Sequence, residues 1–393
     1  MIRSFMRKVV LAYSGGLDTS CCISWLKNKG FKVICFSANL GSEFSPADLR
    51  KRAVKSGADK VYIKDLKKEF AYDYILSALC ANAVYEGKYV LSTALGRPLI
   101  AKHLVEVAKK EKAGFVAHGC TAKGNDQVRL ELSIKILSPG LKIIAPLREW
   151  DLTSRESEIE YAKNNKIPIK TNKNKIYSID QNIWGVSVEG GSLEDLDKEP
   201  ALNSYVFVKP LGMSINKEVY VDIEFIKGVP CKINGRKMDL VSIIEKLNKL
   251  GAQCGVGRTD LIEDRVIGIK SREVYEAPAA WILHTAHREL ESLTLDKETL
   301  ALKELISLKY AQLVYQGLWF SGLRESLDAF VNKTQDRVTG VIGFKMYKGN
   351  VIIVKRDSSY ALYNKKFATY GDNDKFDRSL SRGFIKLFGM PYR

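Results

Sequence analysis

A glycine pair lies among hydroxyl side chains and one carboxylate in residues 14–20, whose sequence is Ser-Gly-Gly-Leu-Asp-Thr-Ser. Glycines allow consecutive backbone N–H groups to turn toward one point without obstruction by a Cβ atom. Ser14, Thr19 and Ser20 add hydroxyl donors, whereas the Asp18 carboxylate repels a bare phosphate but suits one that carries Mg²⁺. This combination predicts a binding site for pyrophosphate, with Asp18 as the candidate contact to the metal.

A second dense group of polar side chains occupies residues 118–129. Lys123 and Arg129 can bind carboxylates. Asp126 can accept hydrogen bonds from an ammonium group, and Asn125 can bind either kind of group. Cationic and anionic side chains this close together favour a zwitterionic amino acid held beside a nucleotide, although a polar surface loop has a similar composition.

Each polar segment follows a short apolar run and precedes a helical pattern. The runs at residues 8–13 and 115–117 predict buried strands, and helical spacing begins at Thr19 and at about Val128. Unsatisfied N–H groups and the helix dipole favour an anion at a helix N-terminus. An ordinary strand–helix turn could also use a glycine pair, but the hydroxyls and the acid around it favour the phosphate site.

The first ~150 residues alternate strand and helix patterns, which predicts a parallel sheet with helices on both faces. Ligands bind at the carboxyl ends of the strands in such sheets, so residues 14–20, 37–39 and 118–129 are candidates for one site. Residues 67–83 are expected to form one helix, and another is expected to begin at Pro98, which suits a first turn.

Lysine and asparagine crowd around Pro168 between residues 163 and 174, which predicts a linker or crossing loop. Beyond it the pattern is mixed, with helices expected at 240–250 and 297–316 and a strand at 266–269. The tail is apolar enough to pack on a neighbouring subunit. The predicted division is a nucleotide-binding domain at 1–165, an α+β domain at 166–370 and a C-terminal arm at 371–393.

The composition predicts a folded protein, since 46% of the 393 residues are hydrophobic, and no stretch approaches the ~20 apolar residues of a membrane span. The net charge of +17 is spread along the chain without an arginine-rich or aromatic–basic segment, so we do not expect a nucleic-acid partner. The seven cysteines are odd in number and form no C-x-x-C pair, which favours a reduced, cytoplasmic protein.

Residues 14–20 contain neither a Walker A loop nor a dinucleotide fingerprint. They resemble the PP-loop signature S-G-G-x-D-[ST]-S of enzymes that split ATP between its α- and β-phosphates. Together with residues 118–129, they closely resemble the argininosuccinate synthase family. Segments similar to that family follow in order along nearly the whole chain, at 89–98, 177–182, 187–194, 255–260, 263–265 and 270–279.

The family joins citrulline to aspartate with ATP, giving AMP, diphosphate and argininosuccinate. The resemblance implies an α/β fold in which a PP-loop domain of the adenine nucleotide α-hydrolase type precedes a synthetase domain. It also implies a homotetramer that uses ATP with Mg²⁺ and no tightly bound organic cofactor.

The resemblance assigns a substrate to each candidate residue. The residues that it implies for ATP binding are Ala12, Tyr13, Ser14, Gly15, Gly16, Leu17, Asp18, Thr19, Ser20, Ala38 and Gly119. The residues that it implies for aspartate binding are Thr121, Asn125 and Asp126. Those that it implies for citrulline binding are Tyr89, Ala94, Asn125, Arg129, Ser178, Ser187, Glu263 and Tyr275. Ala94 stands where the family has a serine, so Thr93 or Ser92 must supply that contact or it is lost.

The implied reaction has two steps and no protein nucleophile, even though Cys120 lies in the second segment. The ureido oxygen of citrulline attacks the α-phosphate of ATP, and the aspartate amine then displaces AMP from the citrulline adenylate. One alternative is a PP-loop enzyme that thiolates tRNA, which would share the loop and the basic charge but normally carries a cysteine pair. Another is a non-catalytic nucleotide-binding descendant of the ligase.

Overall fold

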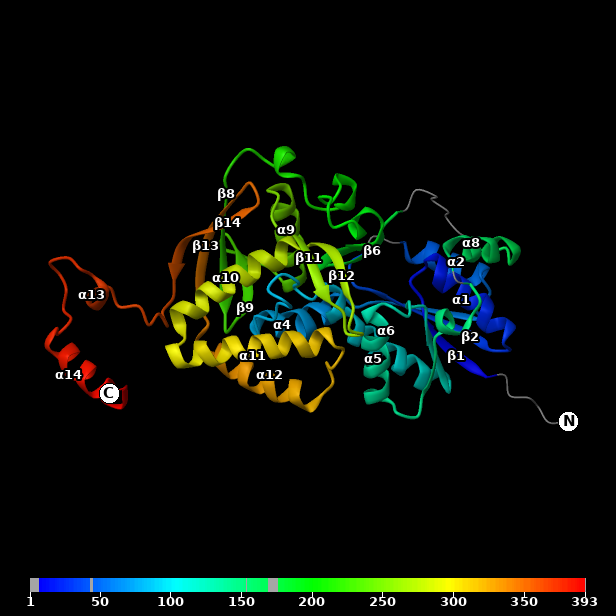
Figure 1. Ribbon diagram of the computed structural model, residues 1–393, viewed down its shortest axis with the longest axis horizontal. Coiled ribbons are helices and arrows are strands. Elements are labelled where there is room, and N and C mark those ends of the chain that lie inside the picture. The colour runs from blue at the N-terminus through cyan, green and yellow to red at the C-terminus, as the bar shows by residue number, and fades with distance from the viewer. Residues whose placement is uncertain (1–6, 43–44, 153, 169–175, 393) are drawn as a thin grey trace.

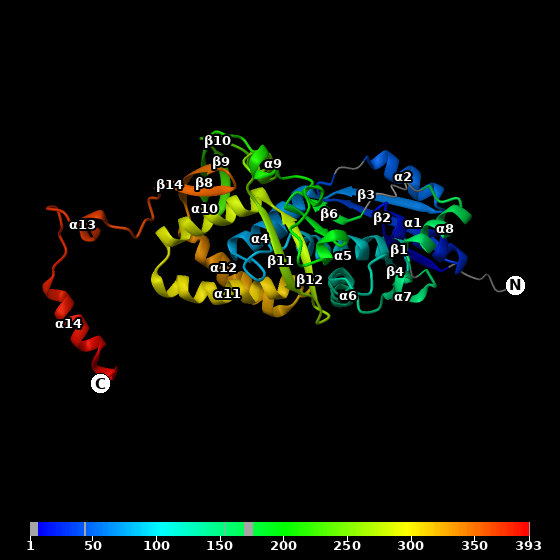
Figure 2. The ribbon, with the colours of Figure 1, turned by 45° about the horizontal axis from the view of Figure 1, so that its top comes forward.

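The computed structural model describes residues 7–42, 45–152, 154–168 and 176–392, which form three β-sheets surrounded by helices (Figures 1 and 2). Residues 169–174 of the predicted linker lie outside the described residues. In the described part of the chain, none of the helices is both long and apolar enough to cross a membrane.

Five parallel strands form the first sheet in the order β3-β2-β1-β4-β5, as the alternating pattern predicts. The chain moves outward from β1 through β2 to β3 and then returns to the other side of β1 with β4. Ala12 therefore pairs with His118, and the two polar segments that follow these residues meet where the strand order reverses. The strands are β1 (Lys8–Ala12), β2 (Lys32–Asn39), β3 (Lys60–Asp65), β4 (Phe115–His118) and β5 (Lys142–Ile144).

Helices cover both faces of this sheet because its buried strands are apolar on both sides. Val9 and Leu11 of β1 join the core that includes α1, α2 and α8, whereas Val10 joins the core that includes α5 and α6. The helices of this part are α1 (Leu17–Asn28), α2 (Pro46–Lys55), α5 (Ser92–Glu111), α6 (Asn125–Leu137), α7 (Pro146–Glu149) and α8 (Arg155–Asn164).

The other two sheets are antiparallel. One has the strand order β11-β12-β7-β6 and the other has the order β10-β9-β8-β13-β14. Their strands are β6 (Ser178–Asn182), β7 (Gly185–Glu189), β8 (Val219–Ile226), β9 (Val229–Ile233), β10 (Arg236–Lys237), β11 (Arg258–Asp264), β12 (Lys270–Glu276), β13 (Gly340–Tyr347) and β14 (Asn350–Asp357). Their helices are α9 (Leu240–Gln253), α10 (Pro278–Thr294), α11 (Lys297–Tyr315) and α12 (Gly322–Thr334).

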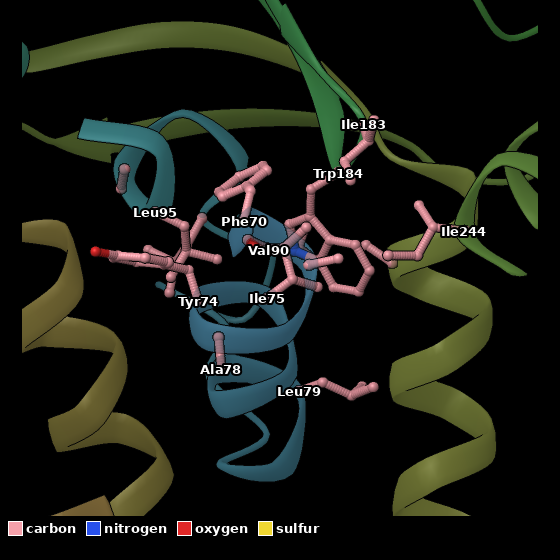
Figure 3. Packing of buried hydrophobic residues seen from close by; sticks show 14 of the residues in the cluster. Phe70, Tyr74, Ile75, Ala78, Leu79, Val90, Leu95, Ile183, Trp184 and Ile244 are labelled. Carbon is pink, nitrogen blue, oxygen red and sulfur yellow. Dashed lines mark hydrogen bonds between the residues drawn. The ribbon is translucent and has the colours of Figure 1, made fainter. Parts of the chain in front are cut away.

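The helix expected at 67–83 is present but packs in an unexpected place. It consists of α3 (Lys67–Glu69), a π-helical segment (Phe70–Ile75) and α4 (Leu76–Cys80), and it contacts α9, α10 and α12. Figure 3 shows its apolar side chains beside Trp184 and Ile244, which come from the later part of the chain. One hydrophobic core therefore joins the first sheet to the antiparallel part.

One expected element is wrong, and another begins earlier than expected. Residues 266–269 do not form a strand but lie in the turn between β11 and β12. The helix expected from Pro98 begins at Ser92, so Pro98 lies inside α5. The Tyr89 hydroxyl accepts hydrogen bonds from the N–H groups of Thr93 and Ala94, at 3.0 and 3.2 Å, and thereby caps the first turn that the sequence pattern did not reveal.

The C-terminal segment carries α13 (Lys365–Ala368) and α14 (Ser379–Phe388) and extends away from the rest of the chain (Figures 1 and 2). Its large apolar side chains are exposed, among them Leu380, Phe384, Ile385, Leu387 and Phe388.

Candidate active site

A cavity of about 430 Å³ lies at the carboxyl ends of β1 and β4 and is also lined by residues of β6, β7, β11 and β12. Most of the residues that we assigned to substrates from the sequence line this cavity. The assigned residues that do not line it are Gly15, Gly16, Leu17, Ser20 and Ala94. The structure thus brings together segments that are far apart in the chain.

The connection from β1 to α1 depends on glycine geometry. Gly15 has a φ of +79°, and a Cβ atom there would lie 2.3 Å from Cδ1 of Leu49. Arg52 of α2 donates a hydrogen bond of 2.8 Å to the Gly15 carbonyl oxygen and fixes this turn. Gly16 is the N-cap of α1, and its N–H group donates 3.3 Å to the Ser14 hydroxyl. The N–H groups of residues 17–19 make no hydrogen bond to a described residue, and of these residues Asp18 and Thr19 line the cavity.

Hydroxyl groups shape the same connection. The Ser20 hydroxyl donates to the Gly16 carbonyl oxygen at 2.7 Å, and the hydroxyls of Ser14 and Thr19 lie 3.1 Å apart. Gly119, which follows β4, approaches this connection closely, because a Cβ atom at Gly119 would lie 2.9 Å from Cγ2 of Thr19. Ser20 therefore holds the backbone, while Ser14 and Thr19 line the cavity.

Asp18 lies in the first turn of α1 and lines the cavity. Burial together with the Asp18 charge raises the pKa of Glu158, in α8, to about 8. Carboxylate oxygens are suitable ligands for a Mg²⁺ ion that is already bound to phosphates. The described residues contain no group of three or more His, Cys, Asp or Glu side chains that could hold a metal ion by themselves.

An arginine that the sequence analysis missed organises the second segment. Nη2 of Arg97, in α5, donates 2.7 Å to Asp126 and also contacts Asp180 of β6. Nη1 of Arg129 donates 3.0 Å to the other oxygen of Asp126. Burial would raise the pKa of Asp126, but the charges and hydrogen bonds of the two arginines bring it below its usual range. Asp126 is therefore a fixed anion between two cations.

A tyrosine that the sequence analysis also missed links two of the assigned residues. The Tyr315 hydroxyl, at the end of α11, donates 2.6 Å to Glu263 and accepts 2.8 Å from Asn125. The Arg129 guanidinium lies 4.7 Å from the centre of the Tyr315 ring, and its Nε donates 2.8 Å to the Tyr315 carbonyl oxygen. Nη2 of Arg129 is buried and has no hydrogen-bond partner among the described residues, so it can receive a carboxylate oxygen from a ligand.

One face of the sheet β11-β12-β7-β6 forms the far wall of the cavity. Strand pairing places Ser178, Glu189 and Glu273 in one row across this face, and Asp180, Ser187 and Tyr275 in the next row. The opposite face is apolar, with Val186, Val188 and Val274 buried. Glu189 and Glu273 were not assigned from the sequence, although each lies two residues from an assigned residue on the same strand. The two-residue period of strands could have found them.

The first turn of α5 completes the wall. Ala94 is fully buried away from the cavity, and its N–H group bonds to Tyr89 instead. Thr93 lines the cavity, and its hydroxyl lies 3.1 Å from that of Ser187, so Thr93 occupies the polar position. Lys123 does not line the cavity.

His118 is not placed as a proton acceptor for a substrate. Its Nε2 lies 3.0 Å from Glu131, and its Nδ1 accepts a hydrogen bond from the Cys120 N–H group. Both ring nitrogens therefore have protein partners.

Comparison with known proteins gives one consistent result. The family model described as arginosuccinate synthase N-terminal HUP domain matches residues 8–168, and the one described as arginosuccinate synthase C-terminal domain matches residues 177–393. A relative named argininosuccinate synthase from Caldanaerobacter subterraneus subsp. tengcongensis is 54% identical and covers 98% of this chain and 94% of its own. A relative of the same name from Pelotomaculum thermopropionicum is 52% identical and covers 99% of this chain and 97% of its own.

Among solved structures, a predicted subunit of tRNA methyltransferase from Methanocaldococcus jannaschii is 15% identical and covers 40% of this chain and 76% of its own. Its TM-score is 0.28, which is too low to support any argument.

Proposed function

This chain belongs to the argininosuccinate synthase family. On that premise, we propose which residues bind each substrate and how they promote the reaction. The chain is an ATP-dependent ligase of arginine biosynthesis that joins L-citrulline to L-aspartate and releases AMP and diphosphate. The citrulline adenylate is the intermediate. The tRNA-thiolating alternative is not favoured, because relatives with the ligase name match nearly the full chain.

In this proposal, residues 12–20 with Ala38 and Gly119 bind ATP, and the diphosphate leaves into the uncapped N-terminus of α1. The close approach of Gly119 to Thr19 supports this assignment, because it places the segment after β4 directly against the segment after β1. Asp18 is the proposed contact to Mg²⁺ on the diphosphate. The ion would neutralise the charge that develops on the leaving group.

Citrulline is proposed to lie between Arg129 and Glu263. The unpartnered Nη2 of Arg129 supports binding of the α-carboxylate, and the carboxylate of Glu263 supports binding of the α-ammonium group. Tyr89, Asn125, Ser178, Ser187 and Tyr275 complete the assigned subsite, and Thr93 takes the place of Ala94.

Aspartate is proposed to bind beside Thr121, Asn125 and Asp126. Its amine must lose a proton before it attacks the ureido carbon. The lowered pKa of Asp126 makes that carboxylate a weak base, which favours a phosphate oxygen of the adenylate as the proton acceptor.

The proposed acceleration comes from positioning and charge neutralisation rather than from a covalent intermediate. Burial raises the pKa of the Cys120 thiol to about 12, so this side chain remains protonated and is a poor nucleophile.

The proposed assembly is a homotetramer in which the C-terminal arm packs on a neighbouring subunit. The apolar side chains of α14 support it, because five of them are 63–70% exposed on the isolated chain. All seven cysteines are free, which supports a cytoplasmic location. We propose domain limits of 1–165 and 166–370, followed by the arm at 371–393.

The observation that carries the proposal is that the α1 N-terminus and the Arg129–Glu263 subsite open into the same cavity. The test is the exchange of labelled diphosphate into ATP by the purified full chain. Exchange should require citrulline but no RNA, and addition of aspartate should release argininosuccinate. Exchange that proceeds equally well without citrulline would contradict the proposal.

A further inference from the structure

Two neighbouring carboxylates in the cavity wall compete for one proton. The Tyr275 hydroxyl contacts Glu263 of β11 and lies 2.8 Å from Oε2 of Glu273. A hydroxyl has a single proton, so it can donate to only one of the two carboxylates. The Tyr275 oxygen also contacts the carboxylate to which it does not donate. That contact is a hydrogen bond only if this second carboxyl group carries a proton and donates it to the Tyr275 oxygen.

The charges around Glu273 lead to the same conclusion. Arg265, in the turn after β11, donates 2.5 Å to Glu189 and 3.4 Å to Glu273. Glu263 receives its second hydrogen bond from the neutral Tyr315. Arg265 thus contacts two of the three carboxylates and none of the oxygens of Glu263, while Glu263 and Glu273 are only 1% and 8% exposed. Burial of a charge that is not fully neutralised is unfavourable. Protonation of one carboxylate removes its charge and thereby this unfavourable free energy.

Glu273 is the member of this group that best holds the proton. It lies between the other two carboxylates, and burial followed by the charges of Glu263 and Glu189 raises its pKa to about 8. Ser271 is its other polar neighbour, with Oγ 3.4 Å from Oε1 of Glu273.

We propose that Glu273 is protonated in the enzyme without citrulline and gives up its proton when the α-ammonium group of citrulline enters the cavity. This inference rests on the proposed function, because it takes citrulline to be the ligand between Arg129 and Glu263. In the exchange, the Glu273 O–H bond breaks, its electron pair stays on the carboxylate, and the proton passes to solvent. The new carboxylate pairs with the ammonium group, while Tyr275 donates to Glu263.

The geometry of Tyr315 supports the position of the ammonium group. The Arg129 guanidinium lies over the ring of Tyr315, and the Glu263 carboxylate lies at its hydroxyl. An α-amino acid that places its carboxylate on Arg129 therefore directs its ammonium group toward Glu263. Glu273 is the next carboxylate along, joined to Glu263 through Tyr275.

The proposal has a quantitative consequence for citrulline binding. With a pKa of about 8, Glu273 is protonated in about 0.9 of the free sites at pH 7, so binding should release about 0.9 protons per site. The bound form lacks this proton, so affinity rises with pH. The citrulline Kd should fall about ninefold from pH 6 to 7 and about fivefold from pH 7 to 8, and it should level off above pH 9.

The test is isothermal titration of citrulline into the full chain saturated with α,β-methylene-ATP, in phosphate and in Tris at pH 7. These buffers differ in heat of ionisation, so the difference in measured heat gives the number of protons released. The wild type should release about 0.9 protons, and Glu273→Gln should release none and show a flat Kd between pH 6 and 8. Glu245→Gln, an exposed position on α9, is the matched control and should behave as the wild type.

The outcomes are distinguishable. Binding of citrulline with fewer than about 0.2 protons released would overturn the inference but leave the proposed function intact. Failure of citrulline to bind would overturn both. Loss of proton release in the Glu189→Gln variant, with proton release unchanged in the Glu273→Gln variant, would also overturn the inference. If Glu273→Gln does not fold, the pH dependence of the wild-type Kd decides, because a constant Kd from pH 6 to 8 contradicts the proposal.

Discussion

Removal of one hydroxyl, in Tyr315→Phe, tests whether the Arg129–Glu263 subsite binds citrulline. The hydroxyl donates 2.6 Å to the buried carboxylate of Glu263 and accepts 2.8 Å from Asn125, so the change affects two proposed citrulline contacts at once. A hydrogen bond to a charged group contributes about 1.5–3 kcal/mol. At about 1.4 kcal/mol per factor of ten, this corresponds to a citrulline KM roughly 10–150 times higher.

The aromatic ring remains, which separates the hydroxyl from packing. Arg129 should stay over the ring, and the ring should remain stacked on Tyr85, whose centre is 3.7 Å away. Tyr310→Phe is the matched control, because this hydroxyl on the same helix donates 2.7 Å to Asp328, and neither residue lines the cavity. It should lower the thermal midpoint without changing the citrulline KM.

The assay is the steady-state rate of AMP formation with citrulline as the varied substrate, combined with thermal denaturation of each variant. The ATP KM of Tyr315→Phe should change less than about threefold, since the hydroxyl does not contact residues 12–20. A citrulline KM equal to that of Tyr310→Phe would refute the assignment of this subsite.

Three further predictions concern other parts of the molecule. Gly15→Ala should raise the ATP KM, measured by steady-state kinetics, by at least about tenfold, because it combines backbone strain with a steric clash. Gly30→Ala has similar backbone strain but no neighbouring atoms, so it should leave the ATP KM unchanged. Lys303→Met leaves the buried carboxylate of Glu291 without its cationic partner. It should lower the free energy of unfolding, measured by urea denaturation, by about 3–5 kcal/mol, and the double variant with Glu291→Met should recover most of this loss. Asp18→Asn should raise the inhibition constant of diphosphate, measured with Mg²⁺, more than the citrulline KM; equal increases would count against its assignment.

The sequence predicts the first half of the site well because parallel sheets constrain where strands end. Apolar runs identify β1 and β4, and polar segments follow both of them. The rule that ligands bind at the carboxyl ends of parallel strands predicts that these segments meet, and the pairing of Ala12 with His118 in the structure brings them together. The expected parallel sheet is confirmed by the structure.

Local patterns fail where a distant partner decides the structure. The helix at Ser92 has an N-terminus capped by the hydroxyl of Tyr89 rather than by a residue of the usual N-cap types. The α3–α4 region is amphipathic, but its apolar face packs on α9 and α10 instead of on the nearest sheet. Propensity and periodicity describe which face of an element is apolar, and they do not identify what covers it.

The site residues that the sequence analysis missed have a common cause. Tyr315 is separated from its partner Asn125 by 190 residues, and Arg97 from Asp180 by 83, so no window of sequence contains both members of either pair. Glu273 could have been found from the sequence, because the assigned residue Tyr275 lies two positions away on the same face of the strand. Once β12 is known to pair with β7, the row that contains Ser187 and Tyr275 fixes the neighbouring row that contains Glu189 and Glu273. Strand register, rather than residue identity, is thus the information that the sequence lacks at this wall of the cavity.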